Sequence, residues 1–122
     1  MCSAAVILCV DDEAAGLTAR RLLLSMTGYT VLLASSGATA LKLFRCNHVD
    51  LVITDYLLGD VVGTDLVSAM KRIKPEVPVV LLTGLMDSRP GFERADLVLT
   101  KGLTPPEFLT EIAKLLPEPS AG

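Results

Sequence analysis

Aromatic and basic residues are both scarce in this chain of 122 residues, and tryptophan is absent. Aromatic side chains make up 4% of the sequence, too few for the stacking surfaces that bind single-stranded nucleic acid. The 11 basic residues stand against 14 acidic ones, which gives a formal net charge of −3. Proteins that bind the phosphate backbone of DNA or RNA need a basic face, so we expect no direct binding of nucleic acid.

Long hydrophobic runs and paired cysteines are also missing. No apolar run approaches the roughly 20 residues of a membrane-spanning helix, and we find no secretory signal, so no membrane association is expected. Cys2, Cys9 and Cys46 form no C-x-x-C pair, and His48 is the one histidine. Structural zinc and a disulfide framework are therefore not expected, and a reduced, cytoplasmic protein is the default interpretation.

Apolar segments of the kind that form buried strands occur five times. Hydrophobic residues make up 51% of the chain, enough for the core of one domain. Several runs are apolar at every position, as in a parallel sheet that is covered on both faces. The five expected strands are residues 5–10, 30–34, 51–54, 79–83 and 97–100.

Segments with helical spacing separate these strands. The first predicted helix carries an apolar face made of Ala15, Ala19, Leu22, Leu23 and Met26, and Gly28 is expected to end it. Further helices are expected around Leu41 and Phe44, over residues 66–73, and after an N-cap at Thr104. The connection over residues 84–96 contains Pro90 and Gly91 and has room for at most two helical turns.

This strict alternation of strand and helix predicts an α/β fold. We expect a doubly wound, five-stranded parallel sheet in the flavodoxin-like order 2-1-3-4-5, with a short or irregular fourth helix. In that order the first and third strands are neighbours, and ligands bind beyond their carboxyl ends.

Acidic residues follow both of these strands. Asp11 and Asp12 come after the first strand, and Asp55 comes after the third. Because neighbouring strands are about 4.8 Å apart, the three carboxylates must lie close together, where they repel one another or bind a cation. Oxygen-only ligands suit Mg²⁺, and the backbone carbonyl of Leu57 is a further candidate ligand.

Complementary groups follow the next two strands. Thr83 ends the fourth strand with a hydroxyl group, and Lys101 follows the fifth with an ammonium group. A carboxylate nucleophile, a metal, a hydroxyl donor and a cation together stabilise a transferring phosphoryl group, with Asp55 as the expected nucleophile. Each residue alone is common on a surface, but suitable groups at four strand ends on one edge favour a functional site.

In these residues and their spacing, the chain resembles the receiver domain of two-component response regulators over about residues 5–116. The resemblance is carried by VILCVDDE at 6–13, DLVITD at 50–55, Gly63 eight residues after Asp55, VVLLTG at 79–84 and LTK at 99–101.

The resemblance implies a phosphorylatable receiver of a two-component signalling system. Asp55 matches the phosphoacceptor, Asp11 and Asp12 the acidic pair that holds Mg²⁺, Thr83 the hydroxyl residue that meets the phosphoryl group, and Lys101 the lysine of the family. The implied donor is a phosphohistidine on a sensor histidine kinase or a histidine phosphotransfer protein. Such a domain catalyses its own phosphotransfer and dephosphorylation and is a signalling module, so no separate enzyme activity is expected.

Several positions depart from the family pattern or modify it, among them Gly59, which stands where the family has a proline four residues after the acceptor. Val98 replaces the aromatic switch residue, and Gly102 follows Lys101 where the family has a proline in a cis bond, so we expect a trans bond here. Leu57 and Leu85 are apolar where the family's side chains flank the path of the attacking water, which predicts slow self-hydrolysis.

Three other functions stay open. A phosphohydrolase of the haloacid-dehalogenase type needs a second aspartate two residues after the first, where this chain has Leu57. A flavodoxin-like cofactor module needs a glycine-rich phosphate loop in place of the acidic pair. A receiver-like interaction module that signals without phosphorylation is the main alternative, because Val98 and Gly102 alter the usual signalling face. We expect one receiver domain over residues 4–117, tails at 1–3 and 118–122, and no output domain; dimerisation is left open.

Overall fold

The computed structural model describes residues 4–84 and 89–116. The five expected strands form as β1 (Val6–Val10), β2 (Thr30–Ala34), β3 (Leu51–Asp55), β4 (Val79–Thr83) and β5 (Leu97–Thr100). β1 begins one residue later than predicted, and β3 includes Asp55 as its last residue. The α-helices of the described residues are α1 (Ala14–Met26), α2 (Gly37–Cys46), α3 (Gly63–Ile73) and α4 (Pro105–Leu115).

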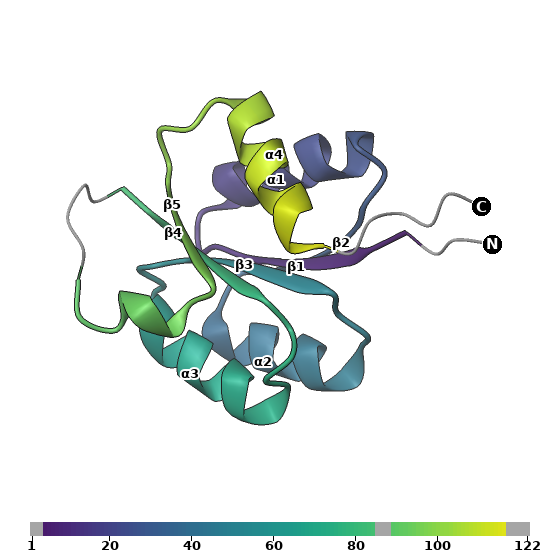
Figure 1. Ribbon diagram of the computed structural model, residues 1–122. Helices are drawn as coiled ribbons and strands as arrows, with labels where there is room; N and C mark the ends of the chain where they lie inside the picture. The colour runs from purple at the N-terminus through teal and green to yellow at the C-terminus, as the bar shows by residue number, and fades with distance from the viewer. Residues whose placement is uncertain (1–3, 85–88, 117–122) are drawn as a thin grey trace.

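The strands form one parallel sheet in the predicted order β2-β1-β3-β4-β5. Figure 1 shows α1 and α4 on one face of the sheet and α2 and α3 on the other. Asp55 pairs in register with Leu82, and Thr83 pairs with Thr100. The carboxyl ends of the central strands therefore lie at one edge, where the residues that follow them meet.

Alternation along the strands divides the core between the two faces. On β1, Leu8 and Val10 belong to the core under α2 and α3, whereas Ile7 and Cys9 belong to the core under α1 and α4. Every residue of β3 and β4 is buried, as the continuous apolar runs predicted.

The helix ends follow the sequence signals. Gly28 adopts a φ of 104° directly after Thr27, the C-cap of α1, which is the left-handed conformation that glycine accepts at little cost. Thr104 caps α4 in a capping box with Glu107, whose side chain returns to the Thr104 backbone N–H. Among the described residues no helix is long and apolar enough to span a membrane.

The apolar face predicted for the first helix is wrong except at Leu23, which is partly buried against the core under α1 and α4, although the helix itself forms. The buried residues of α1 are Leu17 and Leu24, whereas Leu22 is 50% exposed and Met26 is 85% exposed. Ala15 and Ala19 are exposed as well. The physical reason is that α1 turns a different side toward the sheet, a side that also carries Arg20 and brings its guanidinium to Asp11.

The fourth connection is short, as expected. Its described part holds one 3₁₀ turn, η1 (Phe92–Arg94), in place of a full helix. Phe92 is buried and meets the ring of Tyr56 edge to face, with centroids 4.9 Å apart and planes at 81°. Val98 packs against the same core cluster. No peptide bond in the described part of the chain is cis, so the bond between Lys101 and Gly102 is trans, as expected.

Candidate functional site

Three aspartates meet at the carboxyl edge of the sheet. Asp11 and Asp12 follow β1, and Asp55 ends β3, the neighbouring strand. One carboxylate oxygen from each lies within 4.8 Å of the others. Asp11 is 2% exposed and Asp55 is 6% exposed, while Asp12 is open to solvent. The sheet order thus brings together the three acids that the sequence analysis singled out.

Asp11 is held at both of its carboxylate oxygens. Its Oδ1 accepts a hydrogen bond from the backbone N–H of Glu13 at 3.0 Å. Its Oδ2 accepts one from Nη2 of Arg20, which reaches the site from α1 and forms an ion pair with this carboxylate. The buried charge of Asp11 is therefore compensated by a partly buried cation.

Asp55 is paired with Lys101. The ammonium Nζ of Lys101 lies 2.7 Å from Oδ1 of Asp55. The backbone N–H of Lys101 donates to the carbonyl oxygen of Thr83 at 2.9 Å, which ties the ends of β4 and β5 together. The predicted cation and the predicted carboxylate nucleophile are thus in direct contact.

Thr83 and Leu57 lie at the same edge. Thr83 is 2% exposed and ends β4, one residue beyond Leu82, whose carbonyl oxygen accepts from the Tyr56 N–H at 2.8 Å. Leu57 lies in the loop after β3, where it forms a β-bridge with Val62 and is 63% exposed. The ligand role of the Leu57 carbonyl stays a prediction, and Leu85 lies outside the described residues.

The loop after β3 is anchored to the start of α2 by Asp60. Its Oδ1 accepts from the Gly37 N–H at 2.9 Å, and its Oδ2 accepts from the Ala38 N–H at 3.1 Å. These two hydrogen bonds to the charged form hold the pKa of Asp60 below its usual value. The loop that leaves the candidate nucleophile is therefore attached to a second helix on the same side of the sheet.

The chemistry of the cluster fits a hard divalent cation. Carboxylate oxygens are the ligands that Mg²⁺ prefers, and three of them here lie within 4.8 Å of one another. The two cations in contact with the cluster, Arg20 and Lys101, each compensate one carboxylate. One negative charge, that of exposed Asp12, remains for a metal to neutralise.

Sequence reasoning missed Arg20, Gly16 and Asp60. Arg20 and its neighbour Arg21 both look like solvated helix residues, and nothing in their spacing distinguishes the one that turns inward. A signal existed in Gly16, since a glycine inside a helix is unfavourable unless close packing requires it. A β-carbon at position 16 would lie 2.6 Å from Oδ2 of Asp11.

Comparison with known proteins identifies relatives of this chain. The family model of the response regulator receiver domain matches residues 7–113. A probable transcriptional regulator, ycf27 of Cyanophora paradoxa, is 34% identical over 117 residues, which cover 90% of this chain and 47% of that protein. The regulatory protein GlrR of Escherichia coli is 37% identical over 77 residues, covering 63% of this chain and 17% of that protein. The chain thus spans less than half the length of these curated relatives.

Solved structures give the same result. The response regulator TrrA of Thermotoga maritima, in complex with Mg²⁺ and BeF, aligns with a TM-score of 0.87 and 29% identity over 92% of this chain and 99% of that one. A receiver domain of Clostridium thermocellum aligns with a TM-score of 0.82 and 33% identity over 91% and 93% of the two chains. Because the family model matches residues 7–113 of the 122 in the chain, the chain belongs to the response regulator receiver domain family.

Proposed function

We propose that the protein accepts a phosphoryl group on Asp55 from a phosphohistidine. The observation that carries this proposal is the cluster of three carboxylates within 4.8 Å of one another, with Lys101 already on Asp55. A family relative, TrrA, is described in complex with Mg²⁺ and BeF, which supports the same chemistry. The site belongs to a signalling domain, and the reaction is one that the domain performs on itself.

In the proposed reaction, a carboxylate oxygen of Asp55 forms a bond to phosphorus while the P–N bond of the phosphohistidine breaks and its electrons return to the imidazole. Asp11, Asp12, Asp55 and the Leu57 carbonyl would hold Mg²⁺, which supplies positive charge beside the phosphoryl oxygens. Lys101 neutralises a further part of that charge from its place 2.7 Å from Oδ1 of Asp55.

Thr83 has the remaining role in the proposal. Its hydroxyl would donate a hydrogen bond to a phosphoryl oxygen after transfer, because Thr83 ends the strand beside the one that carries Asp55. Thr83 is 2% exposed, so its hydroxyl lies in a region that is largely shielded from solvent.

The proposed partner is a sensor histidine kinase or a histidine phosphotransfer protein, with contact made at this edge of the sheet. Among the relatives is a sensor kinase/phosphatase, LuxN of Vibrio harveyi, which is 32% identical over 78 residues. We further propose a receiver domain over residues 4–117, flanked by tails, and a cytoplasmic location in which such partners carry their phosphohistidines. The alternative of an interaction module without phosphorylation is not favoured, because all the acids and the lysine of the site are retained.

Intact-mass measurement after incubation with acetyl phosphate tests the proposal. We expect one phosphoryl adduct that forms with Mg²⁺ and not with EDTA. Asp55→Asn should abolish the adduct, because the amide is not a nucleophile for phosphorus. Asp65→Asn is the matched control, since the Asp65 side chain is 69% exposed on α3 and lies outside the cluster.

The adduct should form in the Asp65→Asn variant as it does in the unmodified protein. An adduct that persists in Asp55→Asn would place the acceptor elsewhere. The absence of any adduct with acetyl phosphate and with a phosphorylated histidine kinase would reject phosphorylation as the function.

A further inference from the structure

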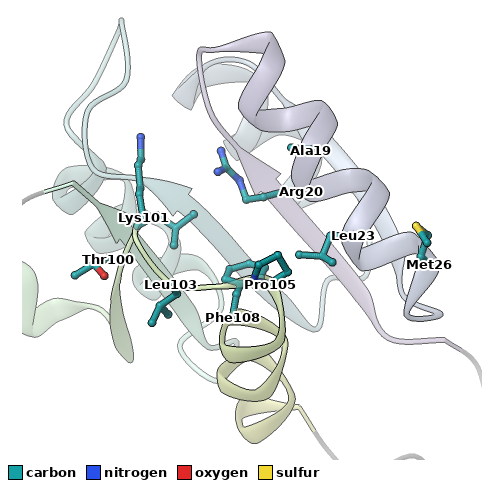
Figure 2. Close-up of a pocket in the computed structure, with 10 residues that line it drawn as sticks. Ala19, Arg20, Leu23, Met26, Thr100, Lys101, Leu103, Pro105 and Phe108 are labelled. Carbon is teal, nitrogen blue, oxygen red and sulfur yellow. The ribbon is translucent and has the colours of Figure 1, made fainter.

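Arg20 is a cation inside the acidic site that the family chemistry described above does not use. It lies on α1 between buried Leu17 and Leu24, and its side chain is 16% exposed. Its guanidinium donates to Oδ2 of Asp11, so it rests on one of the three carboxylates of the cluster. In Figure 2, Arg20 from α1 and Lys101 from the end of β5 extend their nitrogens to the same side of a pocket.

Gly16 provides the space for this contact. A β-carbon at position 16 would lie 2.6 Å from Oδ2 of Asp11 and 3.1 Å from Nη2 of Arg20, both closer than side-chain atoms normally approach. Any other residue one turn before Arg20 would therefore push the guanidinium and the carboxylate apart. Gly16 and Arg20 together therefore allow a guanidinium to lie directly against the carboxylate of Asp11.

The positive charge of Arg20, held at the Asp11 carboxylate, opposes the binding of a divalent cation there. A metal bound by the three carboxylates would lie beside the guanidinium, and two neighbouring cations repel each other. Lys101 presents less of an obstacle, because its side chain is 39% exposed and it contacts Asp55 from the β5 end. Arg20 is the more enclosed of the two and holds the more deeply buried carboxylate.

A pocket beside Arg20 has room for its side chain in a second rotamer. Arg20 lines this pocket of about 490 Å³ between α1 and α4, together with Leu23, Leu103 and Phe108. The guanidinium can turn away from Asp11 into this space while its methylene groups stay against apolar side chains. Release of Asp11 therefore needs a change of side-chain rotamer and no change in the helix.

We propose that Arg20 is a built-in competitor of the divalent cation: it occupies Asp11 in the metal-free protein and gives up this contact when metal binds. The inference rests on the proposed function for the identity of the metal, Mg²⁺. Its consequence is that the Mg²⁺ concentration needed for phosphorylation of Asp55 is raised. If Arg20 occupies Asp11 in about nine molecules out of ten, the apparent dissociation constant rises about tenfold.

Calorimetric titration of the unphosphorylated protein, residues 1–122, with MgCl₂ at constant ionic strength tests the inference. We expect Arg20→Gln to bind Mg²⁺ about tenfold more tightly than the unmodified protein, because the competing charge is gone. Arg20→Lys, which keeps the charge and loses the planar fork, should lie between the two. Arg21→Gln is the matched control: it changes the net charge equally from an exposed position and should alter affinity by less than about twofold.

A second readout follows the arginine itself. In the NMR spectrum of the unmodified protein, the guanidinium N–H signals of Arg20 should shift on addition of Mg²⁺, while those of Arg21 should not. Circular dichroism in EDTA verifies that each variant is folded; if Arg20→Gln does not fold, the Arg20→Lys titration and the NMR readout decide.

The outcomes separate the inference from the proposed function. Equal or weaker Mg²⁺ binding by Arg20→Gln would overturn the competitor role and would leave the phosphoryl site intact, since a residue that merely positions Asp11 gives this result. Failure of every variant and of the unmodified protein to bind Mg²⁺ at millimolar concentration would overturn both the inference and the metal site of the proposed function.

Discussion

A β-carbon at position 63 would lie 2.4 Å from the carbonyl oxygen of Asp55 and 2.9 Å from the Cα atom of Tyr56. Both are backbone atoms and cannot turn aside as the end of a flexible side chain can. Gly63 begins α3, and its N–H donates to the Tyr56 carbonyl oxygen, so the helix starts directly against the peptide of the proposed phosphoacceptor. The absence of a side chain at this residue allows α3 to begin this close to Asp55.

Gly63→Ala should therefore lower the free energy of unfolding by about 1–3 kcal/mol, the usual cost of overpacking a tight site. Gly84→Ala is the matched control, because a β-carbon there would meet nothing within 4 Å, and it should change stability by less than about 0.5 kcal/mol. Urea unfolding of the three proteins measures both values. Equal stability of Gly63→Ala and the unmodified protein would mean that α3 can shift away from Asp55 at little cost.

At the scale of elements, Asp60 joins the β3–α3 loop to α2. The amino end of α2 carries unpaired N–H groups and a partial positive charge, which a carboxylate stabilises. Ser36 accepts from the Thr39 N–H, and Asp60 accepts from those of Gly37 and Ala38. The β2–α2 loop, through Ser36, and the β3–α3 loop, through Asp60, are thereby both hydrogen-bonded to the amino end of α2.

The depressed pKa of Asp60 gives this attachment a pH dependence. Because the folded-state pKa lies below the unfolded value of 3.8, the charged form stabilises the fold above that pH, and the contribution is lost as pH falls through the folded pKa. Asp60→Ala should be less stable than the unmodified protein at pH 7, and the difference should shrink below pH 3.8. Urea unfolding between pH 7 and pH 3 measures it; Asp65→Ala is the control, and a difference that stays constant with pH would contradict the prediction.

The elements also show how far sequence reasoning reaches. Strand positions and sheet order were predictable, since continuous apolar runs require burial on both faces and the crossovers have one hand. The contact face of α1 was not, because apolar residues occur on more than one side of this helix. Leu17 and Leu24 cover the sheet, and Leu23 packs partly buried against the same core. Ala19 and Met26, which are exposed, line the pocket beside α4. Only the packed structure shows which side of α1 faces the sheet. Arg20 lies on that side, so its contact with Asp11 could not be predicted from the sequence either.

At the scale of the whole molecule, three carboxylates gathered at one edge of the sheet place function in conflict with stability. Asp11 and Asp55 each have a cation, but Asp12 has no hydrogen bond or ion pair with the described residues. Its charge lies near two other carboxylates and repels them. A cation that binds these carboxylates only in the folded protein therefore stabilises the folded state.

Asp12→Asn should therefore stabilise the metal-free protein by about 0.5–1 kcal/mol, an increase of a few degrees in melting temperature, through relief of this repulsion. Mg²⁺ should reverse the order: at 100 times its dissociation constant it stabilises the unmodified protein by about 2.7 kcal/mol, and it stabilises Asp12→Asn less because one ligand is neutral. Thermal unfolding in EDTA and across a Mg²⁺ series measures both effects.

Glu76→Gln, which removes one exposed acid outside the cluster, is the control for net charge and should follow the unmodified protein through the series. If Asp12→Asn is the less stable protein in EDTA, Asp12 is not a source of repulsion. If it gains as much stability from Mg²⁺ as the unmodified protein does, Asp12 is not a ligand, and the metal would have to be held by Asp11 and Asp55 without it.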